Sequence, residues 1–473
     1  MERRARVSKI GRTSPTFDVV VIGGGSAGIA AIEGARAAGA KSVCLVEAEA
    51  RLGGECAFWA CIPTKAMLKA GQVYHQAKFA AGRYGIRTGK VTYDFSALLH
   101  RRDAVVRALT GNGSRLLEFT KKLKVTVKHG SAHFISDKMI DVKGERIRAK
   151  AFVIATGSKE RTPILDGIDT VPVWYSRDVV TMKSLPSSVL IIGGGPIGTE
   201  FSTLFGLLGV KTTLLEYGEH ILPREDAEIA ALAEVGLQQR GVRVLTKTKP
   251  LGIKREGSKF KVTFQEGRKP RQTVTVEKVI AAVGRHPNLS GLTLDRAGVA
   301  VDEHGKLQLS SSLQTNLGHI FAAGDANSRF QFTHVANHEG YIAGWNAAQV
   351  KLDGKRLKVE ETIIPRITFS DPEVASVGMT AAEATKAKKK FKVVRFPFSA
   401  LGRAAIDGNR EGLIKIVVEN KSGFILGAHI IGERAGEIMH ELALTMHLGA
   451  PLSAVQGMLH AYPSWSEVIP AAE

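Results

Sequence analysis

Two stretches of the chain share one pattern of apolar and glycine positions. Residues 17–28 read Phe-Asp-Val-Val-Val-Ile-Gly-Gly-Gly-Ser-Ala-Gly, an apolar run that leads into three spaced glycines, Gly23, Gly25 and Gly28. An Ala-rich segment follows, and a second apolar run, Ser42 to Val46, ends at the acidic Glu47. A short apolar run, a glycine turn, a helical segment and a second apolar run predict one β-α-β unit.

The same pattern returns at residues 189–200, which read Val-Leu-Ile-Ile-Gly-Gly-Gly-Pro-Ile-Gly-Thr-Glu. Its three spaced glycines are Gly193, Gly195 and Gly198. The next apolar run, Val210 to Leu215, ends at Glu216. The sequence therefore predicts two β-α-β units of the same kind.

The spacing of the glycines and of the acidic residue has a physical meaning. The first glycine permits a tight turn, the second lets a pyrophosphate approach the backbone, and the third lets helix and strand pack closely. The start of the helix then offers free N–H groups and a positive dipole to phosphate. Glu47 lies 19 positions beyond Gly28, close to the spacing of an acid that binds a ribose hydroxyl. Two complete units predict two bound dinucleotides.

The acid of the second unit also bears on the choice of cofactor. A carboxylate at Glu216 would repel a 2′-phosphate, which prefers a nearby arginine. Residues 217–221 contain no Lys or Arg, and Arg224 is the nearest basic residue. The second unit is therefore predicted to bind NAD rather than NADP.

The pattern of apolar and polar residues changes after Glu360. Short alternating runs, such as Gly412 to Val418 and Phe424 to Ile431, alternate with helical segments and carry no nucleotide fingerprint. This region is predicted to be a separate α+β domain that serves packing or association.

Composition places the chain among multidomain globular proteins. Its 473 residues suggest about three domains at ~150 residues each, with 44% hydrophobic and 23% charged residues. No run approaches the ~18 apolar residues of a membrane helix, so no membrane span is expected. The basic N-terminal residues 1–16 lack the apolar core of a secretory signal and are expected to form a tail. The expected location is the cytoplasm.

The charge is the unusual feature of this composition. Lys and Arg number 65 and Asp and Glu 45, a net charge of +20. Such a charge attracts acidic partners. The basic residues are nevertheless spread along the chain, and the two denser runs, 121–128 and 386–392, lack the interleaved aromatics that stack on bases. Solvated faces explain them, and nucleic acid is not an expected partner.

Two of the three cysteines lie close together beside a glycine pair. Residues 53–65 read Gly-Gly-Glu-Cys-Ala-Phe-Trp-Ala-Cys-Ile-Pro-Thr-Lys, with Cys56 and Cys61 five positions apart, whereas Cys44 lies in an apolar run. An ideal helix would place the pair on opposite sides, so a disulfide, whose Cα atoms lie within ~7 Å, requires a distorted helix start. Two thiols are too few for structural zinc, and no metal site is expected.

Close thiols in a cysteine-poor chain indicate redox chemistry in a reducing compartment. A thiolate at a helix N-terminus is the reactive species. A dithiol of this kind can take two electrons from a flavin and pass them to a substrate disulfide by exchange.

Together these features resemble the flavin-dependent pyridine nucleotide-disulfide oxidoreductases, the group that contains dihydrolipoamide dehydrogenase, glutathione reductase and mercuric reductase. The resemblance runs from Phe17 to Glu467, and its most specific block is Cys-x4-Cys-x-Pro-x-Lys. Four further blocks stand in the family's order: Ala155-Thr156-Gly157-Ser158, Val283-Gly284-Arg285-His286-Pro287-Asn288, Ile320-Phe321-Ala322-Ala323-Gly324-Asp325, and the segment from Pro365 to Glu373.

The resemblance implies an α/β fold with two Rossmann-like dinucleotide-binding domains and a C-terminal α+β dimerisation domain. The implied boundaries are a FAD-binding domain in two parts, an NAD-binding domain between them and the dimerisation domain after them: 17–160 and 286–355, 161–285, and 356–473. A homodimer is implied, because in relatives the C-terminal segment completes the partner's active site.

The resemblance also assigns cofactor-binding residues. FAD would be bound by the first fingerprint and by residues from several blocks: Gly23, Gly25, Gly28, Glu47, Gly54, Lys65, Ala132, Thr156, Gly157, Ser158, Asp325, Gln331, Phe332, Thr333 and His334. NAD would be bound by the second fingerprint and a later glycine: Gly193, Gly195, Gly198, Glu216 and Gly284.

The catalytic residues follow from the same resemblance. Cys56 would exchange with the substrate and Cys61 would contact the flavin. Lys65 would lie by the flavin N5 edge and pair with Glu200, where a cation stabilises negative charge on the reduced flavin.

The C-terminal segment departs from the lipoamide and glutathione enzymes, which carry a base histidine before a proline. This chain reads His460-Ala461-Tyr462-Pro463-Ser464-Trp465-Ser466-Glu467, so Tyr462 stands at the base position while Glu467 is retained. Tyrosine has an ordinary pKa of about 10 against about 6.5 for histidine, so it is a poor proton acceptor at neutral pH. His460 is offset by two residues and is an alternative base.

Two hypotheses about the electron acceptor therefore remain open. The intact cysteine pair and Glu467 favour an NADH:disulfide oxidoreductase that acts on a small-molecule or protein-bound disulfide. Mercuric reductases resemble this chain in having a tyrosine at the base position, so a metal ion or a quinone is the alternative acceptor. Their extra C-terminal cysteine pair is absent, since the chain ends Pro470-Ala471-Ala472-Glu473. Phe58 and Trp59, between the cysteines, fit core filling and substrate shaping equally well.

Overall fold

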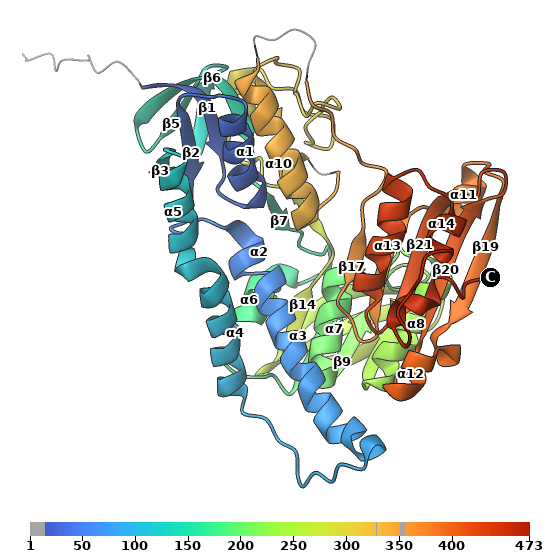
Figure 1. The fold of residues 1–473 in the computed structure, drawn as a ribbon. Helices are drawn as coiled ribbons and strands as arrows, with labels where there is room; N and C mark the ends of the chain where they lie inside the picture. The colour runs from blue at the N-terminus through green and yellow to red at the C-terminus, as the bar shows by residue number, and fades with distance from the viewer. Residues whose placement is uncertain (1–14, 328, 351–355) are drawn as a thin grey trace, which may run out of the picture. The chain divides into compact units, whose positions relative to one another are not determined.

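The computed structural model describes residues 15–327, 329–350 and 356–473, and the chain folds as two compact units (Figure 1). Unit 1 comprises Met1–Phe58, Leu109–Lys159 and His286–Val359. Unit 2 comprises Trp59–Ala108, Glu160–Arg285 and Glu360–Glu473. Most of the basic tail expected at 1–16 lies outside the described residues.

Unit 1 is built on a seven-stranded sheet in the order β3-β2-β1-β6-β5-β4, with β16 also paired to β6. Its strands are β1 (Thr16–Ile22), β2 (Val43–Glu47), β3 (Thr126–His129), β4 (Ala132–Ser136), β5 (Met139–Val142), β6 (Glu145–Ile154) and β16 (Ile320–Ala322). The first half of the long β6 pairs antiparallel with β5, and its second half pairs parallel with β16. The central strands are runs of Val, Ile and Ala buried on both faces, as a covered parallel sheet requires.

Helices cover this sheet. They are α1 (Ser26–Ala37), α2 (Gly54–Phe58), α5 (Ser114–Lys122), α9 (Leu294–Ala297) and α10 (Thr333–Ala348), with 3₁₀ turns η3 (Gly111–Gly113) and η5 (Gly324–Asn327). α1 and α10 pack at backbone distance through glycines. A Cβ added at Gly340 would lie 2.1 Å from the carbonyl oxygen of Ala27. A Cβ added at Gly344 would lie 1.9 Å from the carbonyl oxygen of Ala31. Only glycine permits this approach.

Unit 2 contains a second parallel sheet in the order β10-β9-β8-β14. Its strands are β8 (Ser188–Ile192), β9 (Lys211–Leu215), β10 (Val242–Leu245) and β14 (Lys278–Ala281). α7 (Pro196–Leu207) and α8 (Ala227–Gln239) follow β8 and β9, and α7 is buried along nearly its whole length. A three-stranded antiparallel sheet is formed by β11 (Thr248–Glu256), β12 (Lys259–Glu266) and β13 (Gln272–Val276).

The C-terminal part of unit 2 is a five-stranded antiparallel sheet in the order β17-β18-β21-β20-β19. Its strands are β17 (Arg366–Thr368), β18 (Glu373–Gly378), β19 (Phe391–Pro397), β20 (Gly412–Glu419) and β21 (Ile425–Gly432). Its helices are α11 (Ala381–Lys386), α12 (Gly402–Ile406), α13 (Ala435–His447) and α14 (Leu452–Gln456), with 3₁₀ turns η6 (Phe398–Ala400) and η7 (Trp465–Val468). This arrangement confirms the predicted change to an α+β fold after the second nucleotide fingerprint.

The remaining elements surround these sheets or connect the units. They are α3 (Cys61–His75), a π-helical turn η1 (Gln76–Ala80), a 3₁₀ turn η2 (Ala81–Tyr84), α4 (Phe95–Thr110), η4 (Ile168–Thr170), α6 (Ser176–Thr181), and the paired short strands β7 (Ser158–Glu160) and β15 (Arg285–Pro287). Residues 59–108, which we expected within the first part of the FAD-binding domain, group with unit 2. Within the described residues no helix is long and apolar enough to cross a membrane.

Candidate active site

The first fingerprint forms the turn between β1 and α1. Gly23 has φ +109°, and a Cβ there would lie 2.2 Å from the carbonyl oxygen of Ala155. A Cβ on Gly28 would lie 1.7 Å from the carbonyl oxygen of Gly23. Both positions therefore exclude any side chain, for the reasons that the spacing predicts.

Glu47 ends β2 against this turn. Its carboxylate accepts hydrogen bonds from the backbone N–H groups of Gly24, at 2.6 Å, and Glu49, at 2.8 Å. These two bonds fix the carboxylate next to the glycine turn, and the remaining lone pairs of its oxygens suit the hydroxyl groups of a ribose.

The second fingerprint repeats this geometry between β8 and α7. Gly193 has φ +104°, and a Cβ on Gly198 would lie 1.9 Å from the carbonyl oxygen of Gly193. Glu216 accepts from the N–H groups of Gly194 and Gly218, each at 2.6 Å. The two nucleotide units are thus built alike in their turns and in the position of their acid.

The open space at these turns fits a dinucleotide. A Cβ added to Gly195, which caps α7, would meet no atom within 4 Å, so a pyrophosphate can approach the backbone there. In unit 1 the buried Oγ1 of Thr156 has no hydrogen-bond partner among the described residues. An unpartnered buried hydroxyl is costly, and a bound polar group would satisfy it. The residues present therefore fit both cofactors.

The other expected FAD residues all belong to unit 1 except Lys65. A Cβ on Gly54 would lie 2.8 Å from the Cα of Gly25, so the start of α2 rests on the glycine turn. Ser158 Oγ donates to Asp325 at 2.6 Å. Gly157 has φ +71°, and Ala132 is buried at the start of β4. Gln331, Phe332, Thr333 and His334 lie at the start of α10, where the rings of Phe332 and His334 stack at 5.5 Å.

The cysteines stand on either side of a break between two helices. Cys56 lies in α2, in unit 1, and Cys61 is the first residue of α3, in unit 2. Ala60, the N-cap of α3, has φ −135° and ψ −96°, which is not helical. The segment from Cys56 to Cys61 is therefore not one continuous helix, and a disulfide between the two cysteines stays a prediction. Cys61, as the first residue of this 15-residue helix, lies at the positive end of the helix dipole.

The structure brings Lys65 and Glu200 together. Lys65 lies one turn after Cys61 on α3, and α3 packs against α7, whose Glu200 is buried. Lys65 Nζ donates to Glu200 Oε2 at 2.6 Å. This is the pair that we expected, and its place beside the flavin stays a prediction.

Sequence analysis missed a third member of this cluster. Phe369, in the loop after β17, donates its backbone N–H to the other oxygen of Glu200 at 3.1 Å. Its ring centroid lies 4.8 Å from Lys65 Nζ. Phe369 lies in the Pro365–Glu373 block, but nothing in the block marks it as a partner of a distant lysine.

A second aromatic contact concerns the segment between the cysteines. The guanidinium of Arg177, in α6, lies 4.4 Å from the ring centroid of Trp59. Trp59 is half-buried, whereas its neighbour Phe58 is buried, with Arg51 at 4.4 Å from its ring. Of the two aromatic residues, Phe58 therefore fits core filling better.

The C-terminal segment separates its two candidate bases. The His460 side chain is 5% exposed; its Nε2 lies 3.1 Å from Glu441 Oε2 and its Nδ1 lies 3.1 Å from the Met458 carbonyl oxygen. With both ring nitrogens engaged, His460 does not suit the role of substitute base. Tyr462 is 79% exposed, and Glu467 accepts from the N–H of Ser464 at 2.8 Å.

Gly284 completes the expected residues of the second nucleotide site. It has φ +100°, and its carbonyl oxygen accepts from the N–H of Arg161 at 2.9 Å. A Cβ there would meet no atom within 4 Å, so the constraint at this position is the backbone conformation.

Comparison with known proteins identifies the family. Residues 17–340 match the pyridine nucleotide-disulphide oxidoreductase model, and residues 364–473 match the dimerisation domain of the same enzymes. The chain is 39% identical to a dihydrolipoyl dehydrogenase of Thermus scotoductus over 97% of both chains, and 34% identical to one of Bacillus subtilis over 96% of both.

A solved structure resembles the whole chain as well. It is a Cu(II) complex of the HOCl-induced flavoprotein disulfide reductase RclA from Escherichia coli, with a TM-score of 0.84 and 28% identity. The match covers 96% of this chain and 98% of the other. The relatives favour disulfide chemistry over the metal-ion and quinone alternatives. The chain therefore belongs to the pyridine nucleotide-disulphide oxidoreductases and is an FAD-dependent NADH:disulfide oxidoreductase with the C-terminal dimerisation domain of a homodimer.

Proposed function

We propose that Cys56 and Cys61 are the redox-active pair and that the acceptor is a disulfide of the lipoyl type. The observation that carries this proposal is the Lys65–Glu200 ion pair, one helical turn after Cys61 on the same helix. The names of the relatives, dihydrolipoyl dehydrogenases, supply the first acceptor to test. The boundaries at 17–160, 161–285, 286–355 and 356–473, and a cytoplasmic location, belong to the same proposal.

The proposed reaction passes two electrons from NADH through the cysteine pair to the acceptor disulfide. Held by the first fingerprint, FAD would supply the two-electron chemistry that links NADH oxidation to disulfide reduction. Two electrons reduce the Cys56–Cys61 disulfide to a dithiol, with one proton from NADH and one from solvent. The Cys56 thiolate then attacks one sulfur of the acceptor disulfide and releases the other sulfur as a thiolate.

Exchange is completed by Cys61. Its thiolate attacks Cys56 in the mixed disulfide, restores the Cys56–Cys61 disulfide and releases the second acceptor thiolate. The two released thiolates take up the two protons. The sum is NADH, a proton and a disulfide converted to NAD⁺ and two thiols.

The chain's other residues bind and orient. Glu47 and Glu216 are held by backbone N–H groups in position to bind ribose hydroxyls. Lys65, paired with and oriented by Glu200, would present a cation where negative charge develops. Tyr462 can donate a hydrogen bond to the acceptor, while Glu467 keeps its segment ordered through Ser464.

The first experiment is anaerobic oxidation of NADH by the purified, flavin-loaded protein with lipoamide as acceptor and NADPH run in parallel. Turnover with NADH and much slower turnover with NADPH are expected, because Glu216 repels a 2′-phosphate. Flavin reduction by NADH without lipoamide turnover would contradict the lipoyl acceptor and move the search to other disulfides.

The cysteine pair is tested by Cys56→Ser. The variant should bind FAD and be reduced by NADH, yet lose acceptor turnover by at least ~10³-fold, because a hydroxyl does not replace a thiolate in exchange. Flavin absorbance measures cofactor retention, and NADH consumption measures turnover. Unchanged turnover would contradict the role of the pair.

The role of Tyr462 is tested by Tyr462→His. A histidine has the pKa of a neutral-pH base, so lipoamide reduction should rise by about tenfold at pH 7. Tyr84→His, at an exposed tyrosine outside both nucleotide units, is the matched control. A rate that stays the same would contradict the idea that a missing base limits this chain.

A further inference from the structure

The loop between Glu216 and α8, residues 217–226, is fixed at both ends within unit 2. At its first end the Glu216 carboxylate binds Gly194 and Gly218. In its middle, the Leu222 N–H donates to the carbonyl oxygen of Gly194 at 2.7 Å, and Leu222 is buried with φ +51°. The position of this loop therefore sets the position of the second glycine turn.

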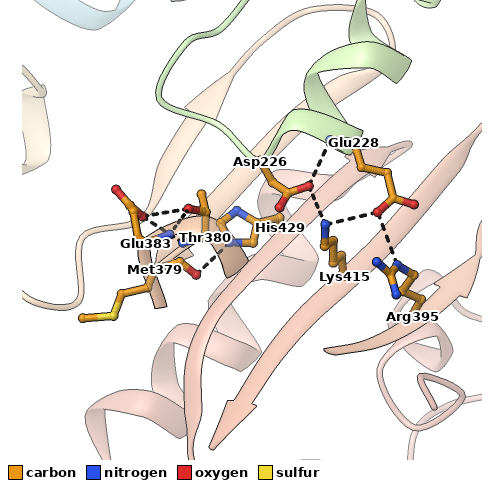
Figure 2. A network of polar contacts seen from close by, with 8 residues as sticks. All are labelled: Asp226, Glu228, Met379, Thr380, Glu383, Arg395, Lys415 and His429. Carbon is orange, nitrogen blue, oxygen red and sulfur yellow. Dashed lines mark hydrogen bonds and ion pairs between the residues drawn. The ribbon is translucent and has the colours of Figure 1, made fainter. Parts of the chain in front are cut away.

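The far end of the loop is held by the C-terminal sheet. Asp226 caps α8 by accepting from the Glu228 N–H at 3.1 Å, and Lys415 Nζ, on β20, donates to the Asp226 carboxylate at 2.8 Å (Figure 2). The side chains of Lys415 and Asp226 are only 8% and 6% exposed. A second ion pair links the same loop to this sheet: Nε of Arg366, on β17, lies 3.3 Å from Oε1 of Glu225.

Neighbouring charges support this buried pair. Lys415 also binds Glu228 Oε2 at 3.1 Å, and Arg395, on β19, reaches the same oxygen at 3.2 Å. His429 lies opposite Lys415 in the β20–β21 register and is fully buried, with its Nε2 3.0 Å from the Met379 carbonyl oxygen. Burial lowers the pKa of His429, which leaves Lys415 as the cation facing Asp226.

The electrostatics agree with the geometry. Burial alone would raise the pKa of Asp226, but the hydrogen bond and the charge of Lys415 bring it below its ordinary value. The carboxylate is therefore charged and held at the start of α8. A buried charged pair of this kind is costly to break, because the partner that remains is left unpaired in a desolvated site.

We propose that Lys415 is a positioning residue for the pyridine nucleotide site. From the C-terminal sheet it holds Asp226, and through Asp226 it holds the loop that carries Glu216 at one end and contacts Gly194 in its middle. The dimerisation domain thereby contributes to NADH binding without touching the nucleotide. This inference rests on the assignment of NADH to the second fingerprint.

The test is Lys415→Met in the flavin-loaded enzyme, with KM for NADH, KM for the acceptor and kcat measured separately. Remote residues of a coupled network alter binding moderately, so KM for NADH should rise about tenfold. The acceptor KM and kcat should change less than about twofold. Lys415→Arg, which keeps the cation, should recover most of the affinity, and Lys392→Met, at an exposed lysine of β19, is the matched control.

A second variant keeps the test decisive if Lys415→Met does not fold. Asp226→Asn combined with Lys415→Met removes the unpaired buried carboxylate, while Asn still caps α8. The double variant should also show a raised KM for NADH. If neither variant retains flavin, hydrogen exchange on the unaltered enzyme replaces the kinetic test. NAD⁺ is then expected to slow amide exchange at residues 226–230 as well as at residues 217–221.

Three results would overturn the inference. The first is an unchanged KM for NADH in a Lys415→Met protein whose melting temperature falls. The second is full affinity for NADH in the double variant. The third is amide exchange that NAD⁺ slows at residues 217–221 alone. Each would make the cluster a structural clamp between parts of unit 2. An unaltered enzyme that fails to oxidise NADH would instead contradict the proposed function.

Discussion

Phe369 illustrates how one residue holds two functional side chains. Its backbone N–H binds Glu200 and its ring lies under the Lys65 ammonium group. A partly exposed cation–π contact contributes about 0.5–2 kcal/mol. Phe369→Leu keeps the N–H and loses the ring, so kcat with NADH should fall about fivefold. Phe369→Tyr should restore it, and equal losses in both variants would contradict the contribution of the ring.

Glu373, on β18, gives the molecule a pH-dependent stability. Burial, together with the charges of Glu433 and Glu437, raises the pKa of its carboxyl from 4.5 to about 7, although the Gly436 N–H and Arg434 act in the opposite direction. Because the folded state binds this proton more tightly, its contribution is fully present below pH 4.5 and is lost as the pH rises through 7.

The prediction concerns Glu373→Gln, which keeps an acceptor for the Gly436 N–H without the charge. Relative to the unaltered protein, its free energy of unfolding should rise between pH 5 and pH 8 by up to about 3 kcal/mol. Urea denaturation at four pH values measures the difference. A difference that is the same at every pH would contradict the raised pKa.

At this scale the sequence could identify residues that belong to local patterns. The glycines, Glu47 and Glu216 follow from fixed spacings, because a turn and the strand after it are built from neighbouring residues. Phe369, Arg177 and Lys415 could not be found in this way. Their roles depend on contacts between segments more than 100 residues apart, and no periodicity in the chain encodes such a contact.

Among the elements, α1 and α10 form a helix pair whose close packing depends on glycine. α1 begins at the first fingerprint and α10 begins at the residues expected to line FAD, so their packing distance sets both. In Gly344→Ala the new Cβ would lie 1.9 Å from the Ala31 carbonyl oxygen and would push the helices apart. Overpacking of this kind costs about 1–3 kcal/mol.

We therefore expect Gly344→Ala to lower the melting temperature and to release FAD on gel filtration. Gly89→Ala, at a position where a Cβ meets no atom within 4 Å, is the matched control. If Gly344→Ala retained FAD and stability, α10 could move without harm to the cofactor site.

The strands of the second nucleotide unit and of the C-terminal sheet agree closely with the apolar runs. The expected strand before Gly193 is β8, and the expected runs at 412–418 and 424–431 are β20 and β21. A covered strand needs several consecutive apolar residues, so its pattern is strong. The grouping of residues 59–108 with unit 2 was not predictable, because it depends on α3 packing against α7 rather than on any pattern within either helix.

At the scale of the molecule, the dimerisation domain exposes large apolar side chains on α13 and in the C-terminal segment. Leu448 is 69% exposed at the end of α13, Leu444 lies one turn before it, and Leu459 is fully exposed. The opposite face of α13 is buried through Ile438 and Leu442. An apolar face of this kind on a matched dimerisation domain is expected to lie against a second copy.

Leu444→Asp combined with Leu448→Asp should therefore give a folded monomer, because the buried face of α13 is unchanged. The resemblance implies that the C-terminal segment completes the partner's active site, so we expect the monomer to keep FAD reduction by NADH and to lose at least ~100-fold of acceptor turnover. Sedimentation velocity and the two half-reactions measure this, with Leu232→Asp on α8 as the matched control. A monomer with full acceptor turnover would show that one chain holds the whole site, and a persistent dimer would place the interface elsewhere.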